Sequence, residues 1–133
     1  MFAPIQHRDK NVDIDQVLRS VVRVRSSVPE DAFTATTLGT VREGSGVVIR
    51  ESGVILTIGY LITEANKVWL TTRDGRAMAA HPLAYDQKTG FGLVQALGRL
   101  DLPALNFGDS EKAAIGDPVV LADGTGLSVE TPS

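Results

Sequence analysis

Short runs of β-branched and apolar residues, separated by glycine-containing turns, recur along most of this chain and limit its fold more than any other feature. The clearest case is a pair of runs, Val47–Ile49 and Val54–Thr57, joined by the turn Arg50–Gly53, which predicts a β-hairpin. A second turn signal, Asp74-Gly75, separates two further strand-like runs. This pattern predicts an all-β fold with about six or seven short antiparallel strands, arranged as a barrel or a sandwich.

The remaining segments complete the expected organisation. A short helix is predicted over residues 12–18, where Asp13 and Asp15 suit the helix N-terminus. We expect a loop over 26–40 and single helical turns over 61–65 and 109–114. The expected strands are 21–24, 47–49, 54–57, 67–72, 77–85, 91–97 and 118–122. The predicted domain organisation is a polar lead over 1–11, a barrel over 12–123 and a polar tail over 124–133.

Composition excludes several kinds of chemistry. A length of 133 residues predicts one domain with a core of its own. The 13 basic and 16 acidic residues give a net charge of −3, which argues against a nucleic-acid partner. Because the chain has no cysteine and only two histidines, His7 and His81, we expect no disulfide, no metal site and no cofactor. We expect His7 to be solvated and His81 to be exposed or structural.

The N-terminal residues carry no signal for export. Met1–Ile5 is followed by charged residues, and no apolar stretch has the length of a signal-peptide core. No window reaches the roughly 18 apolar residues of a membrane span, so we expect none. The sequence as given is typical of a cytoplasmic protein, or of a periplasmic one whose export segment has been removed, and it does not separate the two.

Several motifs together resemble the first barrel of trypsin-like serine proteases of the HtrA/Deg type, which have the chymotrypsin fold. No single motif is specific, but their order and spacing agree over about residues 12–122. The resemblance implies one half of a double β-barrel. The motifs are Gly44–Ile49 with Gly53–Thr57, Val68–Arg76 with its Asp-Gly turn, Asp86–Thr89 followed by Leu93-Val94, and Leu102-Pro103 with Gly108–Ser110 and Ile115–Val120.

The sequence departs from this family at the catalytic positions. Counted along the resemblance, Tyr60 stands where the family has its catalytic histidine, and Gly90 stands where it has the aspartate. The serine of the family lies in a second barrel that this sequence does not contain. A tyrosine phenol ordinarily titrates near pH 10 and is a poor base at neutral pH, and a glycine cannot orient a base. The sequence therefore predicts no catalytic residue and no peptidase activity.

Two serines occur in motifs that look nucleophilic. Gly108-Asp109-Ser110 imitates the nucleophile motif of trypsin-like enzymes, but Glu111 and Lys112 follow where an oxyanion hole needs glycines. Gly44-Ser45-Gly46 is better explained by glycines that allow close backbone approach at the start of a strand. We interpret both motifs as structural.

Other candidates favour structural roles. The acidic pairs Asp13 with Asp15 and Glu64 with Asp86 do not have the spacing of a calcium loop, so we expect solvated surface. We expect Trp69 to pack in the core or between strands, and Arg73 and Arg76 to be exposed turn charges.

Three functional hypotheses follow. The first is a catalytically inactive, protease-like barrel that acts as a binding or scaffold domain, with a protein or peptide, a second barrel or another copy as its partner. The second is the N-terminal part of a longer HtrA-like serine endopeptidase whose serine lies in the second barrel. The third is an unrelated small barrel of OB or SH3 type, against which the acidic charge and the seven aromatic residues argue.

Overall fold

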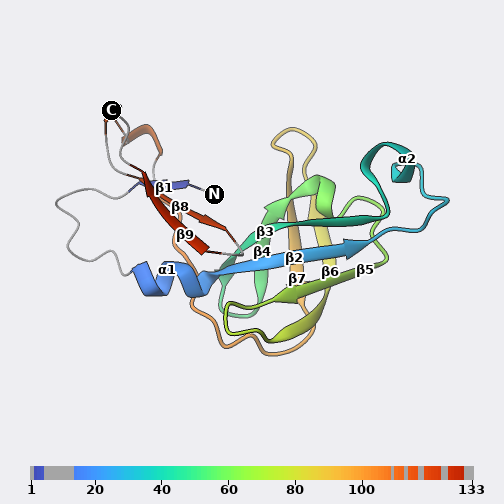
Figure 1. Cartoon of the computed structure of the whole chain (residues 1–133), viewed down its shortest axis with the longest axis horizontal. Coiled ribbons are helices and arrows are strands. Elements are labelled where there is room, and N and C mark those ends of the chain that lie inside the picture. The colour runs from blue at the N-terminus through green and yellow to red at the C-terminus, as the bar shows by residue number, and fades with distance from the viewer. Residues whose placement is uncertain are drawn as a thin grey trace.

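Six antiparallel strands close into a barrel at the centre of the molecule (Figure 1). The computed structural model describes residues 2–4, 14–108, 110–112, 114–116, 119–123 and 126–130. The strands are hydrogen-bonded in the order β2-β3-β4-β7-β6-β5, and β5 returns to β2. Their bounds are β2 Val21–Ser27, β3 Val41–Arg50, β4 Val54–Ile58, β5 Lys67–Thr71, β6 Ala77–Tyr85 and β7 Phe91–Ala96. The predicted all-β class and the antiparallel barrel are confirmed.

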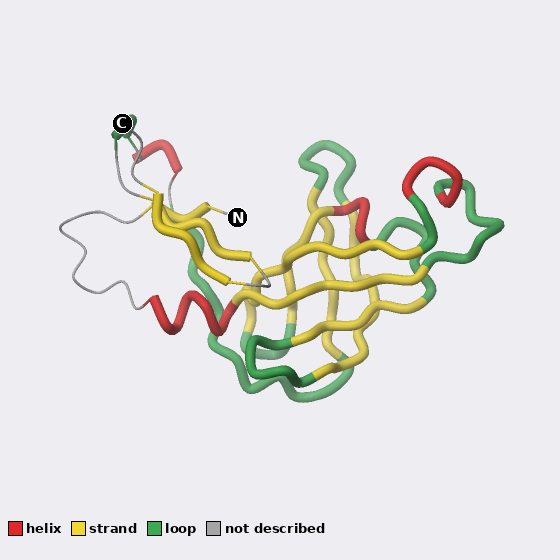
Figure 2. Tube along the Cα trace, viewed as in Figure 1, coloured by secondary structure: helices red, strands yellow, loops and turns green. Residues whose placement is uncertain are grey.

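Three short strands form a second, open sheet outside the closed barrel (Figure 2). They are β1 Phe2–Pro4, β8 Val119–Asp123 and β9 Gly126–Glu130, in the order β1-β8-β9. A strand was predicted at 118–122, but it pairs outside the closed barrel. The strands in the predicted lead and tail were not expected. β1 pairs with β8, which lies near the other end of the chain, whereas β9 pairs with β8 as the next strand along the chain and was missed because its segment was interpreted as a polar tail.

The helices are short and lie at the ends of strands. They are α1 Ile14–Ser20, α2 Ala35–Leu38, and the 3₁₀ turns η1 Gly59–Leu61 and η2 Ser110–Lys112. The short N-terminal helix is confirmed. The loop predicted over 26–40 is wrong at two places, because β2 continues to Ser27 and the loop contains α2. Four residues are too few to show helical periodicity in a sequence. Among the described residues, no helix has both the length and the apolar content needed to cross a bilayer.

Alternation along the strands builds the interior of the barrel. Val22 and Val24 of β2 are fully buried, while Arg23 and Arg25 between and after them are exposed. Gly44 and Gly46 lie on the side of β3 that faces the interior of the barrel. Because they have no side chains, side chains of neighbouring residues occupy the space beside them. A Cβ at Gly46 would lie 2.6 Å from Ile55 Cγ2, and one at Gly44 would lie 2.7 Å from Leu61 Cδ1. A close approach was expected at this motif and is present, but the motif lies within β3 and not at the start of a strand, and the approaching groups are mainly side chains.

Side chains from outside the strands close both ends of the barrel. Leu61 and Ile62, in and after η1, are 0% and 5% exposed and pack into the core cluster. Leu100, in the segment after β7, is 2% exposed and belongs to the same cluster. The chain around η1 is thereby fixed to the core by two consecutive apolar side chains. This attachment determines how the neighbouring residue, Tyr60, is presented.

Candidate functional site

Tyr60 lies in η1, between β4 and β5, and points away from the core. The residue after it, Leu61, is fully buried, whereas Tyr60 is 40% exposed. Its hydroxyl donates a long hydrogen bond of 3.3 Å to the carbonyl of Glu43. Because successive side chains of a tight turn point in different directions, the burial of Leu61 and Ile62 directs position 60 outward. This position is therefore available to solvent and to a partner.

Gly90 ends the turn between β6 and β7. Its φ of +77° is left-handed, and its N–H donates to the Asp86 carbonyl at 2.8 Å. Asp86 organises this turn, since its carboxylate accepts from the Lys88 N–H at 3.0 Å and from the Thr89 hydroxyl at 3.2 Å. A Cβ at Gly90 would meet no atom within 4 Å. The turn thus leaves open space where a side chain at position 90 would stand.

A backbone hydrogen bond joins the two loops that carry these positions. The Gly59 N–H donates to the Gly90 carbonyl at 2.6 Å. Two close contacts keep the loops together, because the Tyr85 ring lies against Gly59 and the Ile62 side chain lies against Gly92. Tyr60 therefore directly follows a residue that is hydrogen-bonded to Gly90. The structure brings together the loops on which the two candidate residues lie.

Arg42 holds the loop of Tyr60 to the α2 loop. It is 2% exposed, and its Nη1 donates to the carbonyls of Tyr60 and Thr63, both at 2.8 Å. Its Nε donates to the Gly39 carbonyl at 3.2 Å and its Nη2 to the Thr34 hydroxyl at 2.8 Å. The sequence analysis did not identify this residue. The available signal was a charged residue two positions before Gly44, on the inward side of a strand.

Glu64 fixes the other side of the same loop. Its two carboxylate oxygens accept from the backbone N–H groups of Phe33 and Thr34, at 2.8 and 2.7 Å. A side-chain hydrogen bond from Thr34 lowers the pKa of the Glu64 carboxyl most; these N–H groups and Arg42 lower it further, and burial opposes them. Glu64 has a left-handed φ of +59°, which the clamp holds in place. It was predicted only as solvated surface; it is exposed, but it also orders a loop.

The two serine motifs carry no catalytic arrangement in the described part of the chain. The Ser45 carbonyl accepts from the Thr57 hydroxyl at 2.8 Å within the barrel wall. Ser110 opens the 3₁₀ turn η2. Asp109, the middle residue of its motif, lies outside the described residues. The structural interpretation of both motifs stays a prediction.

The remaining candidates are surface residues. Of the two places expected for Trp69, the core is excluded by its 47% exposure, and it lies between strands instead, on the outer face of β5 between Arg25 and Ala79. Its inward neighbours Val68 and Leu70 fill the core instead. His81 is exposed, as are Arg73 and Arg76. Residues His7 and Asp13 lie outside the described part. Among the described residues, no three His, Asp or Glu side chains form a metal-binding group.

Large apolar side chains surround the contact between Gly59 and Gly90. We call this group the apolar corner: Ile58, Tyr60, Tyr85 and Phe91, which are 54%, 40%, 48% and 47% exposed. Ile58 and Phe91 are direct partners across β4 and β7, and Tyr85 pairs with Gly92 at the end of β6. Half-exposed aromatic residues gathered at one place favour a contact surface.

The strand order and the position of the two joined loops define one barrel of a chymotrypsin-type fold. The model of the trypsin-like peptidase domain family matches residues 44–130. Two structures of the HtrA-type protease AlgW with a tripeptide have TM-scores of 0.70 and 0.68 and are 22% and 21% identical. Each match covers 87% of this chain and 36% of the protease chain.

Curated proteins with similar sequences are also serine proteases of this type by name. A probable periplasmic serine endoprotease, DegP-like, of Chlamydia muridarum is 31% identical over 74 residues, which are 56% of this chain and 15% of the relative. A probable periplasmic serine protease, do/HhoA-like, of Haemophilus influenzae is 36% identical over 75 residues, 56% of this chain and 16% of the relative. Serine protease HTRA1 of Xenopus laevis is 31% identical over 87 residues, which are 65% of this chain and 19% of the relative.

This chain belongs to the trypsin-like peptidase family and corresponds to the N-terminal barrel of its HtrA-type members. It spans less than a fifth of the length of these three curated relatives.

Proposed function

We propose that this barrel is a catalytically inactive, protease-like domain that binds a protein or peptide partner. The observation that carries the proposal is the pair of joined loops, in which Tyr60 and Gly90 occupy the positions that the family resemblance gives to the catalytic histidine and aspartate. A phenol and a bare backbone offer neither a base that works at neutral pH nor a group to orient one. The framework of the site is kept while its chemistry is absent.

The apolar corner supports a binding role. Its four side chains belong to the same two loops and to the strand ends beside them. The loop of Tyr60 is stiffened by buried Arg42 and by the carboxylate of Glu64, and the turn of Gly90 by Asp86, so the surface is ordered before a partner binds. Order in the free state lowers the entropic cost of binding. A second barrel, another copy of the chain or a peptide are the partners that this surface fits.

A peptidase assay tests the inactive state. The purified chain is incubated with casein, in parallel with the variants S45A and S110A. We expect no hydrolysis above buffer. Hydrolysis that survives in both variants identifies a contaminating protease if it separates from the chain on further purification. Hydrolysis that either variant abolishes would overturn the proposal.

The second candidate is a portion of a longer HtrA-like endopeptidase. The small share of each relative that the chain covers, between 15% and 19% in the three described above, favours it. A reading frame that continues into a Gly-x-Ser-Gly-Gly segment would support this candidate. Such a protein would still carry Tyr60 and Gly90, so we expect it to be inactive unless another residue supplies the base.

A further inference from the structure

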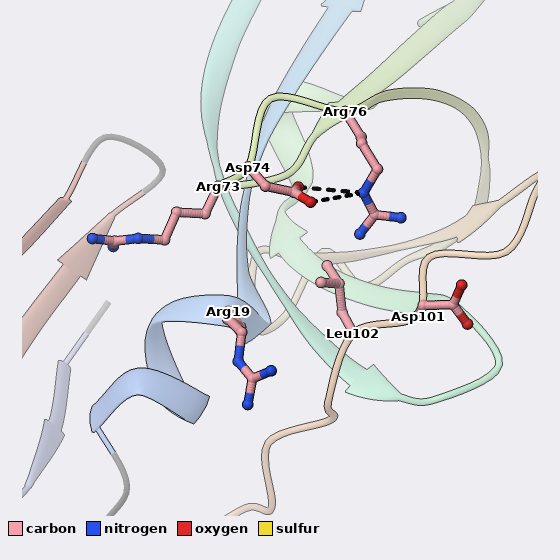
Figure 3. A pocket seen from close by; sticks show the side chains of 6 residues that line it. All are labelled: Arg19, Arg73, Asp74, Arg76, Asp101 and Leu102. Atoms are coloured by element: carbon pink, nitrogen blue, oxygen red, sulfur yellow. Dashed lines mark hydrogen bonds and ion pairs between the residues drawn. The ribbon is translucent and has the colours of Figure 1, made fainter.

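A pocket of about 390 Å³ opens at the other end of β6 from the apolar corner (Figure 3). Three segments line it: the last turn of α1, the turn between β5 and β6, and the segment after β7. Their residues are Arg19, Arg73, Asp74, Arg76, Asp101 and Leu102. Three of the six are arginines, although the whole chain has a net charge of −3. No feature of the proposed function uses this pocket.

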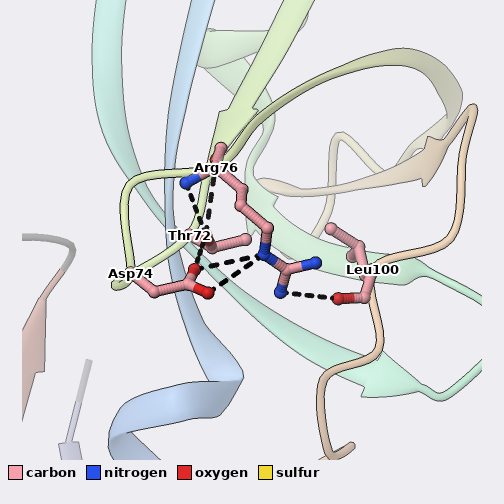
Figure 4. Close-up of polar contacts among 4 residues, drawn as sticks. All are labelled: Thr72, Asp74, Arg76 and Leu100. Atoms are coloured by element: carbon pink, nitrogen blue, oxygen red, sulfur yellow. Dashed lines mark hydrogen bonds and ion pairs between the residues drawn. The ribbon is translucent and has the colours of Figure 1, made fainter.

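The β5–β6 turn holds one arginine in a fixed orientation (Figure 4). The Arg76 Nε–H donates to both oxygens of Asp74, at 3.3 and 3.1 Å, and its Nη2 donates to the Leu100 carbonyl at 2.9 Å. The buried Thr72 hydroxyl donates to Asp74 and accepts from the Arg76 backbone N–H at 3.0 Å. These hydrogen bonds use Nε and Nη2 of Arg76 and leave Nη1 unused. The guanidinium is therefore oriented before any ligand binds, with donor capacity left.

The carboxylates of the pocket are already engaged. Asp74 is paired with Arg76, and Asp101 accepts from the Nε–H of Arg99 at 2.6 Å. Within the part of the chain that the structure describes, Arg19 and Arg73 have neither an acidic partner nor a side-chain hydrogen bond. Arg19 lies in the last helical turn, where a cation also suits the helix dipole. The pocket thus carries an excess of positive charge.

The arrangement in Figure 3 indicates which groups a ligand would meet. Arg19 and Arg76 lie on opposite sides of Leu102, which contributes an apolar surface between them, while the Arg73 side chain extends away from Arg76. Guanidinium groups bind phosphate and carboxylate oxygens through paired N–H donors. Arg73 is exposed, and its long side chain is free to rotate toward a bound anion.

We propose that this pocket binds a small oxyanion, a phosphate or carboxylate group, between Arg19 and Arg76, with Arg73 as a third donor. Because these arginines are exposed, the affinity is modest and depends on salt. The site is separate from the loops of Tyr60 and Gly90, so its occupancy does not depend on whether the barrel is an active protease.

A nuclear magnetic resonance titration with inorganic phosphate at constant ionic strength tests this site. We expect saturable shifts of the backbone amides of residues 72–76 and 100–102 and of the Arg76 Nε–H. The variant R19Q/R73Q should bind about fivefold or more weakly. The matched control K67Q/K88Q also loses two positive charges, at the other end of the barrel, and should change the affinity less than twofold.

Each outcome decides the question. A parallel titration with succinate at the same ionic strength distinguishes a phosphate ligand from a carboxylate ligand. Saturable shifts with phosphate alone identify the ligand as a phosphate group, and saturable shifts with succinate identify it as a carboxylate. Shifts that rise linearly with both anions, or an equal loss of affinity in R19Q/R73Q and K67Q/K88Q, would overturn the proposal. The amide spectra of both variants show directly whether the fold is kept.

Discussion

At the scale of single residues, the loop of Tyr60 is held by groups other than Tyr60 itself. Arg42 donates to two carbonyls of the loop, and Glu64 joins the loop to the backbone of Phe33 and Thr34. Within the described part of the chain, one long hydrogen bond depends on the Tyr60 side chain. The residues that hold the loop are therefore different from Tyr60, and each can be tested alone.

Restoring the two absent groups tests whether positions 60 and 90 correspond to the catalytic pair. In the variant Y60H/G90D, we expect the carboxylate to raise the pKa of the new imidazole by about 0.5–1 unit relative to Y60H, because an adjacent negative charge favours imidazolium. The imidazole pKa is measured by nuclear magnetic resonance. The control Y60H/G75D places a carboxylate at another glycine with positive φ and open space, at the other end of β6. Equal pKa values in the two double variants would contradict the correspondence.

The Glu64 clamp predicts a dependence of stability on pH. The pKa of Glu64 in the folded state is lowered from its ordinary value of 4.5. The carboxylate therefore stabilises the fold above pH 4.5, and this contribution is lost as the pH falls through the lowered pKa. Urea unfolding at pH 7 and at pH 3 should show a smaller difference in stability for E64Q than for the unmodified chain.

The matched control for this measurement is E30Q. Glu30 lies on the loop between β2 and α2, which Glu64 holds through Phe33 and Thr34. It is exposed and has no hydrogen-bond or ion-pair partner among the described residues. We expect E30Q to keep the pH dependence of the unmodified chain. A curve for E64Q that coincides with that of E30Q would show that the clamp does not contribute.

At the scale of elements, local signals predicted two hairpins, and long-range pairing explains part of what they missed. The turns at Arg50–Gly53 and Asp74-Gly75 are local, so the hairpins around them were predicted, but β3 begins at Val41 and not at residue 47 as expected. The strand β1 pairs with β8 across almost the whole length of the chain, so no local pattern predicts it; β8 itself was predicted, and β9, which pairs with it, was missed. For Trp69 the core and an inter-strand position were both left open, and the alternation decides between them, because inward Val68 and Leu70 direct Trp69 to the outer face.

The candidate site was predictable only through the family resemblance. Tyr60 and Gly90 are 30 residues apart, and no spacing rule joins them; the contact between Gly59 and Gly90 continues the pairing of β4 with β7, which are not consecutive strands. The arginine pocket was not predictable at all, since its lining comes from three separate segments.

The glycine-lined wall of β3 gives a prediction about packing. In G46A, the new methyl group would lie 2.6 Å from Ile55 Cγ2 and 2.9 Å from Val24 Cγ2. We expect a loss of about 1–3 kcal/mol in the free energy of unfolding, measured with urea, because a close-packed interior has no room for it. The control G108A adds the same group where no atom lies within 4 Å, and should change stability by less than about 0.5 kcal/mol.

At the scale of the whole molecule, two sheets of different kinds share one chain. The six-stranded barrel is closed and has no free edge, whereas the β1-β8-β9 sheet has two edge strands. Every barrel strand is paired on both sides, but β1 and β9 are paired on one side only. We therefore expect the barrel to be the more stable unit.

Amide hydrogen exchange measures this difference directly. Amides of β2, β4 and β7 that are paired in the barrel should exchange only through global unfolding. Paired amides of β8 and β9 should exchange at least about tenfold faster, through local opening of the small sheet. Equal protection in the two sheets would show that they unfold as one cooperative unit.

The anchoring of η1 by Leu61 and Ile62 has an evolutionary consequence. Since the buried neighbours and the backbone hold the turn, the identity of the outward side chain at position 60 is free to drift. If position 60 is the catalytic position, as proposed, an exchange of a reactive ring for an inert one there removes the chemistry in a single step and is expected to keep the barrel folded. An inactive member of such a lineage would then arise without an unstable ancestor.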